Sequence, residues 1–255
     1  MAQGVNVVID GVRCQGKVGE MMLNVARAHG FVIPTLCHHE GLNPYGACRL
    51  CLVEVMAGGP TGLHSSCTLP VGAGLEVATQ SESVLMARRA VVELLLNRTP
   101  KVPFVQQLAA GMGIGPLSDA GSEERCVLCG RCVRACAQIG AHAIGFAGRG
   151  IHRRVTTPFQ HIPRTCIGCR ACFNVCPTGA IESHLSPDRV RMALLDIPPW
   201  ELETVACCRC GKPTVTGQAW KLVQQEVAEE LQAADPLCPS CRRTEMLRRL
   251  GEGFK

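Results

Sequence analysis

Two cysteine runs with the same spacing, C-x2-C-x2-C-x3-C, constrain this chain more than any other feature of its 255 residues. The runs begin 40 residues apart and consist of Cys126, Cys129, Cys132 and Cys136, and of Cys166, Cys169, Cys172 and Cys176. A [4Fe–4S] cube needs four thiolates at the corners of a tetrahedron, and two-residue gaps allow one tight loop to supply three of them. Each run therefore predicts one [4Fe–4S] cluster whose fourth thiolate comes from elsewhere in the chain.

The fourth cysteine of each run has a separate role. In proteins with two clusters of this kind, that cysteine binds the cluster of the other run. The predicted ligand sets are therefore Cys126, Cys129, Cys132 and Cys176 for the first cluster, and Cys136, Cys166, Cys169 and Cys172 for the second. Zinc sites or buried structural thiols are the alternative, but the complete spacing occurs twice, which favours iron–sulfur clusters.

The residues around the second run resemble those of bacterial dicluster ferredoxins. The similarity lies in Ile167-Gly168-Cys169-Arg170-Ala171-Cys172 and in Cys176-Pro177-Thr178-Gly179-Ala180-Ile181. Two features depart from that family. Ala137 stands where many such runs have proline, and the 29-residue spacer at 137–165 predicts an inserted hairpin or loop.

A third cysteine quartet lies near the N-terminus, with the spacing C-x10-C-x2-C-x15-C. It consists of Cys37, Cys48, Cys51 and Cys67. With the flanking residues 33–36 and 46–55, it is similar to the N-terminal domain of the large iron–sulfur subunit of respiratory complex I, and equally to the small diaphorase subunit of NAD-reducing hydrogenases. The resemblance implies one [2Fe–2S] cluster on a β-grasp fold.

Other ligands are conceivable for this quartet. Zinc or structural thiols are one alternative, and His38 and His39 suggest a Rieske-like site in which two histidines replace two cysteines. Four cysteines already complete a site and the Rieske spacing is absent, so we expect both histidines to face solvent or to lie around the ligands. The family usually carries a further His-x3-Cys-x2-Cys-x5-Cys segment. The corresponding residues 97–105 contain no His or Cys, so that extra cluster is predicted to be missing.

Two more cysteine pairs lie near the C-terminus, in the pattern C-x2-C-x27-C-x2-C. They are Cys207, Cys210, Cys238 and Cys241. A tetrahedral zinc ion fits four such thiolates best and would stabilise a module of about 50 residues that is too small to rely on its own core. A rubredoxin-like iron or a further cluster is the alternative. Cys208 could exchange with Cys207 as a ligand, and Cys14 is expected to be a buried apolar residue.

The hydrophobic pattern predicts an α+β chain of several modules. Strands are expected at 5–9, 12–14 and 52–56, and helices at 21–29 and 84–96, the latter with a capping box of Thr79 and Glu82. The predicted modules are a [2Fe–2S] β-grasp domain at 1–80, a helix and linker at 81–121, a two-cluster ferredoxin domain at 122–186, a linker at 187–204 and a zinc-ribbon-like module at 205–255. In the last module, Trp220, Val223, Val227 and Leu231 fall on one face of a predicted helix.

The N-terminus lacks the features of a signal peptide, and no apolar run approaches the length of a membrane helix, so a cytoplasmic protein with reduced thiols is expected. The formal charge is +5. Four thiolate-bound metal sites of about −2 each would change it to about −3, so the charge is weak support for a nucleic-acid partner.

The chain contains no G-x-G-x-x-G or P-loop motif and no nucleophile–base pair. The patterns therefore predict an electron-transfer subunit rather than a catalytic one. The resemblance implies a hetero-oligomer with a flavin/NAD(P)-binding subunit and a catalytic subunit of the hydrogenase or formate dehydrogenase type. A stand-alone ferredoxin-like carrier is one alternative, and a redox-sensing nucleic-acid-binding protein that uses the C-terminal zinc module is another.

Overall fold

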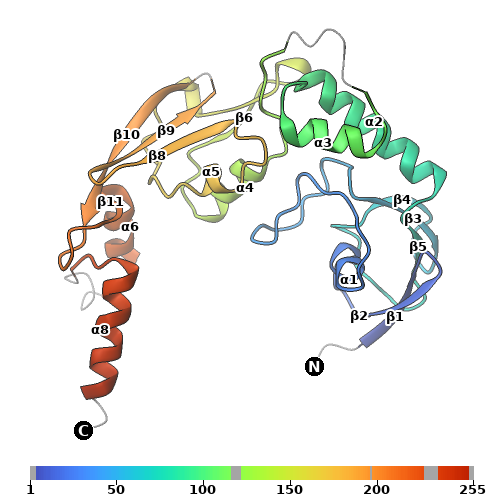
Figure 1. The fold of residues 1–255 in the computed structure, drawn as a ribbon, viewed down its shortest axis with the longest axis horizontal. Coiled ribbons are helices and arrows are strands. Elements are labelled where there is room, and N and C mark those ends of the chain that lie inside the picture. The colour runs from blue at the N-terminus through green and yellow to red at the C-terminus, as the bar shows by residue number, and fades with distance from the viewer. Residues whose placement is uncertain (1–3, 116–121, 196, 227–234, 253–255) are drawn as a thin grey trace. The chain divides into compact units, whose positions relative to one another are not determined.

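The computed structural model describes residues 4–115, 122–195, 197–226 and 235–252. The chain divides into two compact units, Met1–Arg134 and Ala135–Lys255, which are described separately below (Figure 1). The division falls inside the predicted two-cluster domain at 122–186, so the domain limits drawn from the sequence stay a prediction. Among the described helices, none combines the length and apolar character needed to cross a membrane.

The first unit is built on a mixed five-stranded sheet. Its order is β2-β1-β5-β3-β4, in which β1 and β5 are parallel and the other neighbours are antiparallel. The Asp10-Gly11 turn joins the first two strands, and both residues have the positive φ that a tight hairpin turn requires, so the strands predicted at 5–9 and 12–14 are confirmed as a hairpin. The strands are β1 (Gly4–Ile9), β2 (Val12–Lys17), β3 (Leu52–Ala57), β4 (Gly62–Ser65) and β5 (Glu76–Ala78).

Helix α1 (Met22–Ala28) covers one face of this sheet. Met22 and Leu23 are fully buried, together with Val7 and Ile9 of β1 and Val77 of β5. Burying a side chain of this kind contributes about 1.5–3 kcal/mol, so the alternating pattern of β1 is enough to fix which face is inside. The helix predicted at 21–29 is confirmed to within one residue at each end.

Helices α2 (Glu82–Arg98) and α3 (Pro103–Gly111) follow the sheet and pack against each other. The N-cap of α2 is Ser81, so the predicted capping box was wrong. Thr79 instead donates from its backbone N and its Oγ1 to the Asp10 carboxylate, at 2.6 and 2.5 Å. The helix and linker predicted at 81–121 contain this second helix as well, because Pro103 occupies its first turn, where the missing N–H is not needed.

In the second unit, the spacer between the cysteine runs forms the predicted insertion. It contains the hairpin β6 (Gly145–Ala147) and β7 (Arg154–Thr156), with short 3-10 turns at Gly150–His152 and Pro158–Gln160. Helix α4 (Arg131–Gln138), which begins in the first unit, carries Cys132 and Cys136 of the first run, and the short helix α5 (Ala171–Asn174) carries Cys172 of the second.

A four-stranded antiparallel sheet follows the second run, in the order β11-β10-β9-β8. The predicted linker at 187–204 was wrong, because these residues form a strand pair. Pro198 and Pro199 are tolerated within β10 because the pairing with β9 shifts register between Ile197 and Trp200, where no ladder N–H is required. The strands are β8 (Ile181–Leu185), β9 (Arg189–Leu194), β10 (Ile197–Ala206) and β11 (Pro213–Thr216).

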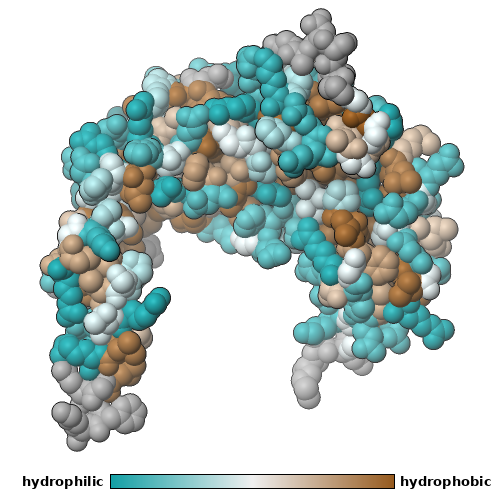
Figure 2. Space-filling model, in the orientation of Figure 1, coloured by the Kyte–Doolittle hydropathy of each residue, from teal (hydrophilic) through white to brown (hydrophobic). Residues whose placement is uncertain are grey.

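Two helices complete the second unit, α6 (Gly217–Glu226) and α8 (Pro239–Glu252). The predicted helix around Trp220 and Val223 is confirmed as α6, whereas Val227 and Leu231 lie outside the described residues. Hydrophilic and hydrophobic residues are interleaved along α8 (Figure 2), which exposes Met246 and Leu247.

Candidate iron–sulfur and metal sites

The structure brings the N-terminal quartet together. The Cys37 N–H donates to the Cys48 sulfur at 3.5 Å, and side-chain hydrogen bonds link Cys37 to Cys48 and Cys67, and Cys51 to Cys67. Hydrogen bonding from the Cys48 and Cys67 thiols lowers the pKa of Cys37 to about 2. Cys37, Cys51 and Cys67 are buried, so the four sulfurs form a thiol-rich site that is largely closed to solvent.

The backbone around these sulfurs supplies N–H donors. Gly46 and Arg49 both have positive φ, and a Cβ on Gly46 would lie 3.1 Å from Thr68. The left-handed turns direct N–H groups inward: those of Cys48 and Ala47 reach Cys37, and that of Leu50 reaches Cys48. Such a nest of donors suits an anionic thiolate cluster, so this donor set fits a [2Fe–2S] group.

The two histidines beside Cys37 differ in their surroundings. Both ring nitrogens of His38 are buried without a partner among the described residues, and burial, with Arg27 and Arg131 nearby, lowers its pKa. His39 Nδ1 accepts a hydrogen bond from the Gly41 N–H. Neither belongs to a described group that could hold a single metal ion.

The first four-cysteine run starts in the first unit. Leu128 and Gly130 have positive φ, and the Leu128 N–H reaches the Cys126 sulfur. Burial outweighs this bond and raises the pKa of Cys126 to about 11. Three of the predicted ligands, Cys126, Cys129 and Cys132, lie in this unit, whereas Cys176 lies in the other, so this ligand set stays a prediction.

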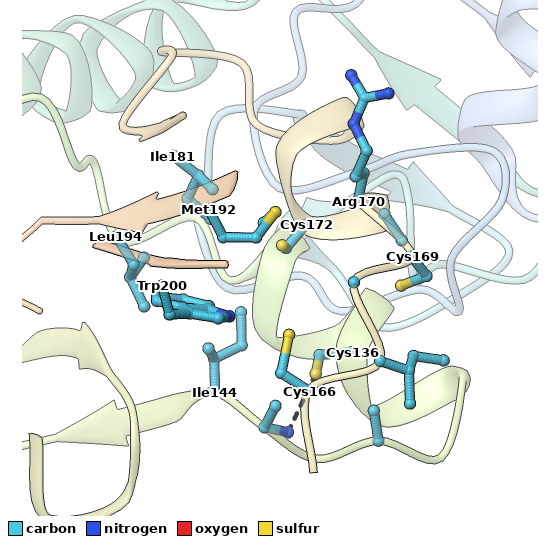
Figure 3. A pocket seen from close by; sticks show the side chains of 15 residues that line it. Cys136, Ile144, Cys166, Cys169, Arg170, Cys172, Ile181, Met192, Leu194 and Trp200 are labelled. Atoms are coloured by element: carbon cyan, nitrogen blue, oxygen red, sulfur yellow. Dashed lines mark hydrogen bonds between the residues drawn. The ribbon is translucent and has the colours of Figure 1, made fainter. Parts of the chain in front are cut away.

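The predicted ligands of the second [4Fe–4S] cluster line one pocket, which Figure 3 shows from close by. Its other walls are apolar, and the Ala143 N–H donates to the Cys136 sulfur at 3.1 Å. Trp200 Nε1 is buried without a partner among the described residues, and in Figure 3 it faces the Cys166 sulfur. The four thiols are those of Cys136, Cys166, Cys169 and Cys172.

The electrostatics of this pocket favour a bound group whose centre is positively charged. Burial raises the pKa of Cys172 to about 12, and the thiolates of Cys169, Cys166 and Cys136 add to the effect. Four thiolates so close together cannot all ionise unless positive charge compensates them. The ferric and ferrous ions of a cluster supply that charge, so the residues present fit the group.

The C-terminal quartet is more compact than the others. The sulfurs of Cys207, Cys210, Cys238 and Cys241 all lie within 4.8 Å of one another, and those of Cys210 and Cys238 are 3.6 Å apart. A tetrahedral ion with metal–sulfur bonds of about 2.3 Å gives sulfur–sulfur edges of about 3.8 Å. Within the described ranges, no other group of three or more potential ligands is compact enough for a single ion.

Hydrogen bonds to a sulfur of this quartet favour the thiolate form, which is the form that binds a metal ion. The backbone N–H of Cys238, followed by those of Cys210 and Arg209, lowers the pKa of Cys207 to about 6. Arg209 also pairs with Glu245 of α8 at 2.5 Å, which connects the two cysteine pairs outside the metal site.

The two remaining cysteines lie outside these groups. Cys208 is exposed and does not belong to the compact group of four cysteines. Cys14 is buried among the apolar side chains of the N-terminal sheet, as predicted. None of the 18 cysteines, all of which lie in described residues, forms a disulfide.

Several residues around the sites were missed by the sequence analysis. Arg134 donates to the backbone carbonyls of Cys37 and Asn43, and Arg98 donates to that of Cys126 at 2.9 Å. Arg134 lies between Cys132 and Cys136 of the first run, so its position in the sequence could have indicated a role at the site. Trp200 follows two prolines in a region expected to be a linker, so no pattern indicated it.

Comparison with known proteins identifies iron–sulfur domains in two parts of the chain. Residues 2–82 match the family described as 2Fe-2S iron-sulfur cluster binding domain, and residues 121–183 match the family described as 4Fe-4S dicluster domain. A crystal structure of NAD+-reducing [NiFe]-hydrogenase in the H2-reduced state has a chain that is 30% identical, with a TM-score of 0.53. The match covers 60% of this chain and 74% of that one.

Two curated relatives show the same relationship. The mitochondrial NADH-ubiquinone oxidoreductase 78 kDa subunit of Candida albicans is 32% identical over 78% of this chain, and the match covers 30% of the relative. The NADP-reducing hydrogenase subunit HndD of Solidesulfovibrio fructosivorans is 32% identical over 70% of this chain and 36% of its own length. The chain thus spans about a third of these relatives. It belongs to the family of iron–sulfur subunits that includes the large iron–sulfur subunit of complex I and the diaphorase subunit of NAD-reducing hydrogenases.

Proposed function

We propose that this chain is an electron-transfer subunit that relays single electrons within a multi-subunit oxidoreductase. One observation carries the proposal most directly: four thiols of the second run line a single pocket with apolar walls and a buried, unpartnered indole N–H. Clusters bound in such sites accept and pass on one electron at a time. The chain's own residues hold the clusters, exclude water and place N–H donors on the sulfurs.

The ligand sets of the proposal are those expected from the spacing. Cys37, Cys48, Cys51 and Cys67 hold a [2Fe–2S] cluster on a β-grasp domain, for which the five-stranded sheet and α1 are supporting features. The two [4Fe–4S] clusters take Cys126, Cys129, Cys132 and Cys176, and Cys136, Cys166, Cys169 and Cys172. In sequence order, the proposed ligands of the [2Fe–2S] cluster come first, and those of the two [4Fe–4S] clusters follow.

The C-terminal quartet is proposed to hold one zinc ion in a zinc-ribbon-like module. The sulfur–sulfur distances support a single ion rather than a further cluster, whose cysteine sulfurs would be about 6–7 Å apart. Zinc is favoured over a single iron because a closed four-thiolate site with no open position is typical of structural zinc.

The proposed partners are a flavin/NAD(P)-binding subunit and a second catalytic subunit of the hydrogenase or formate dehydrogenase type, in the cytoplasm. The support is that relatives include an NADP-reducing hydrogenase subunit and a chain of an NAD+-reducing hydrogenase. A relay subunit should co-purify with these larger subunits from its native host, whereas a stand-alone carrier should purify alone.

The proposal is tested on the full chain purified without oxygen. Iron, acid-labile sulfide and zinc are measured, and the dithionite-reduced protein is examined by EPR. We expect about ten irons, ten sulfides and one zinc per chain, with signals from a [2Fe–2S] cluster and from [4Fe–4S] clusters. Colourless protein without labile sulfide would overturn the proposal.

A further inference from the structure

The C-terminal hairpin of the second unit packs directly on the loop of the second four-cysteine run. Thr216 Oγ1, on β11, donates to the backbone carbonyl of Ile167, which directly follows Cys166. A Cβ built on Gly168 would lie 2.6 Å from Thr216 Cγ2 and 2.8 Å from Cδ1 of Leu202, on β10. Not even one methyl group fits between the hairpin and this loop.

The neighbouring strands close the apolar side of the same pocket. Met192 and Leu194 of β9 and Trp200 of β10 line the pocket together with the four cysteines, and each is at most 5% exposed (Figure 3). Burial raises the pKa of Cys166, and the N–H of Gly168 and the indole of Trp200 act in the opposite direction. The sheet therefore keeps water away from the apolar side of the site and presents it with a donor, whereas Cys169 is exposed.

The compact four-thiol site lies at the free end of this hairpin. Cys207 directly follows β10, Cys210 precedes β11, and the Cys207 N–H donates to the Lys212 carbonyl at 2.8 Å. Cys238 and Cys241 come from the start of α8. The β10–β11 ladder itself is short: it pairs Thr204 with Thr216 and Ala206 with Pro213, with a register shift between them. A ladder of this length is marginal unless something else holds it.

We propose that the ion bound by Cys207, Cys210, Cys238 and Cys241 clamps the β10–β11 hairpin, and that the clamped hairpin shields the adjoining side of the second [4Fe–4S] cluster from solvent. The inference rests on the proposed ligation of that cluster by Cys136, Cys166, Cys169 and Cys172. It gives the C-terminal module a function within this chain. The zinc site, which carries no electrons, maintains the surroundings of the second [4Fe–4S] cluster, which does.

The test compares Cys241→Ser with Cys208→Ser in the full chain, purified anaerobically. Cys241 is one of the four thiols, whereas Cys208 is an exposed neighbour of Cys207 outside the group. A ferrous chelator is added after reduction, and the release of iron is followed with time. We expect Cys241→Ser to lack zinc and to lose about four of its ten irons several-fold faster, with the [2Fe–2S] EPR signal retained. Cys208→Ser should behave like the wild type.

Trp200→Phe identifies which [4Fe–4S] cluster is affected. It keeps the aromatic wall and removes the only indole N–H that faces Cys166 in the described part of the chain. Loss of a donor to a cluster sulfur lowers the reduction potential, so one [4Fe–4S] midpoint should fall in an EPR-monitored titration. The cluster that becomes labile in Cys241→Ser should be the one whose midpoint shifts here.

Thr216→Val tests the hairpin without touching a metal ligand. It removes the hydroxyl that holds Ile167, and Val215→Thr on the same strand is its control, because Val215 is 41% exposed. Thr216→Val should retain zinc and release the same four irons faster. The inference is overturned if zinc-free Cys241→Ser releases iron at the wild-type rate, or if all three clusters are lost together. A wild type without any iron would instead overturn the proposed function.

Discussion

Arg134 donates a hydrogen bond to the backbone carbonyl of Cys37, 97 positions earlier in the chain. A second bond from the same guanidinium reaches the Asn43 carbonyl at 2.7 Å, and the side chain lies over the Tyr45 ring at 4.9 Å. One arginine of the first four-cysteine run thus holds the loop that begins the N-terminal quartet. Because both acceptors belong to that loop, the loop's conformation depends on a residue outside the N-terminal sheet.

Arg134→Ala is predicted to destabilise the first unit by about 2–4 kcal/mol, since two charge-assisted hydrogen bonds are lost. The [2Fe–2S] EPR signal should bleach faster in air, and the apparent melting temperature should fall. Arg134→Lys should recover part of the loss, because one ammonium cannot reproduce both bonds of the planar guanidinium. An unchanged melting temperature in Arg134→Ala would contradict this role.

Arg88→Ala is predicted to cost about 2–4 kcal/mol. Arg88 is 2% exposed and donates to the Leu52 carbonyl at 2.6 Å, so truncation leaves a buried acceptor unpaired and a cavity beneath α2. The matched control is Arg89→Ala, which removes an exposed pair with Glu93 and a long exposed hydrogen bond to the Met112 carbonyl at 3.4 Å, and should cost about 1 kcal/mol or less. Thermal unfolding of the holoprotein under nitrogen measures both, and equal effects of the two variants would count against the argument.

Gly168→Ala is predicted to be much more harmful than Gly179→Ala. Both glycines have φ +65°, which costs a residue with a side chain about 1–2 kcal/mol. Only at Gly168 does the added Cβ meet other atoms within 3 Å, whereas nothing lies within 4 Å at Gly179. Iron content and melting temperature should therefore fall in Gly168→Ala and stay close to the wild type in Gly179→Ala. Similar losses in both variants would show that backbone strain alone is responsible.

Arg98→Met is predicted to loosen the start of the first four-cysteine run. Arg98 Nε donates to the Cys126 carbonyl, and the guanidinium also pairs with Glu124 at 3.3 Å. The variant keeps most of the apolar stem and removes these contacts, so one [4Fe–4S] cluster should release iron faster while the [2Fe–2S] signal is unchanged. Wild-type release kinetics would show that the Cys126 loop does not need this arginine.

The sequence was sufficient for the features that depend on local pattern. The pattern of apolar residues predicts the strands at 5–9 and 12–14, which form the first hairpin, and the helix at 21–29, which is α1. The C-terminal quartet was grouped correctly from spacing alone, because two-residue gaps bring paired thiols to one point.

The features that the sequence did not reveal depend on contacts between distant residues. Pro198 and Pro199 argue against a strand, and only the register shift against β9 makes β10 possible. Thr79 has the residue type of a helix cap, but its N–H and hydroxyl donate instead to the Asp10 carboxylate, 69 positions away. The long-range bonds of Arg134 and Thr216 have no periodic signature, so only the folded chain reveals them.

The apolar cluster around α2 and α3 links the packing of the fold to the spacing of two cysteine groups. Val92, Leu96 and Val105 lie in one buried group that also contacts Cys48 of the N-terminal quartet and Cys129 of the first four-cysteine run. Electron tunnelling slows steeply as the gap between redox centres widens. With the ligand sets proposed above, a substitution that changes the volume of this group would therefore alter both the distance between two clusters and the stability of the fold.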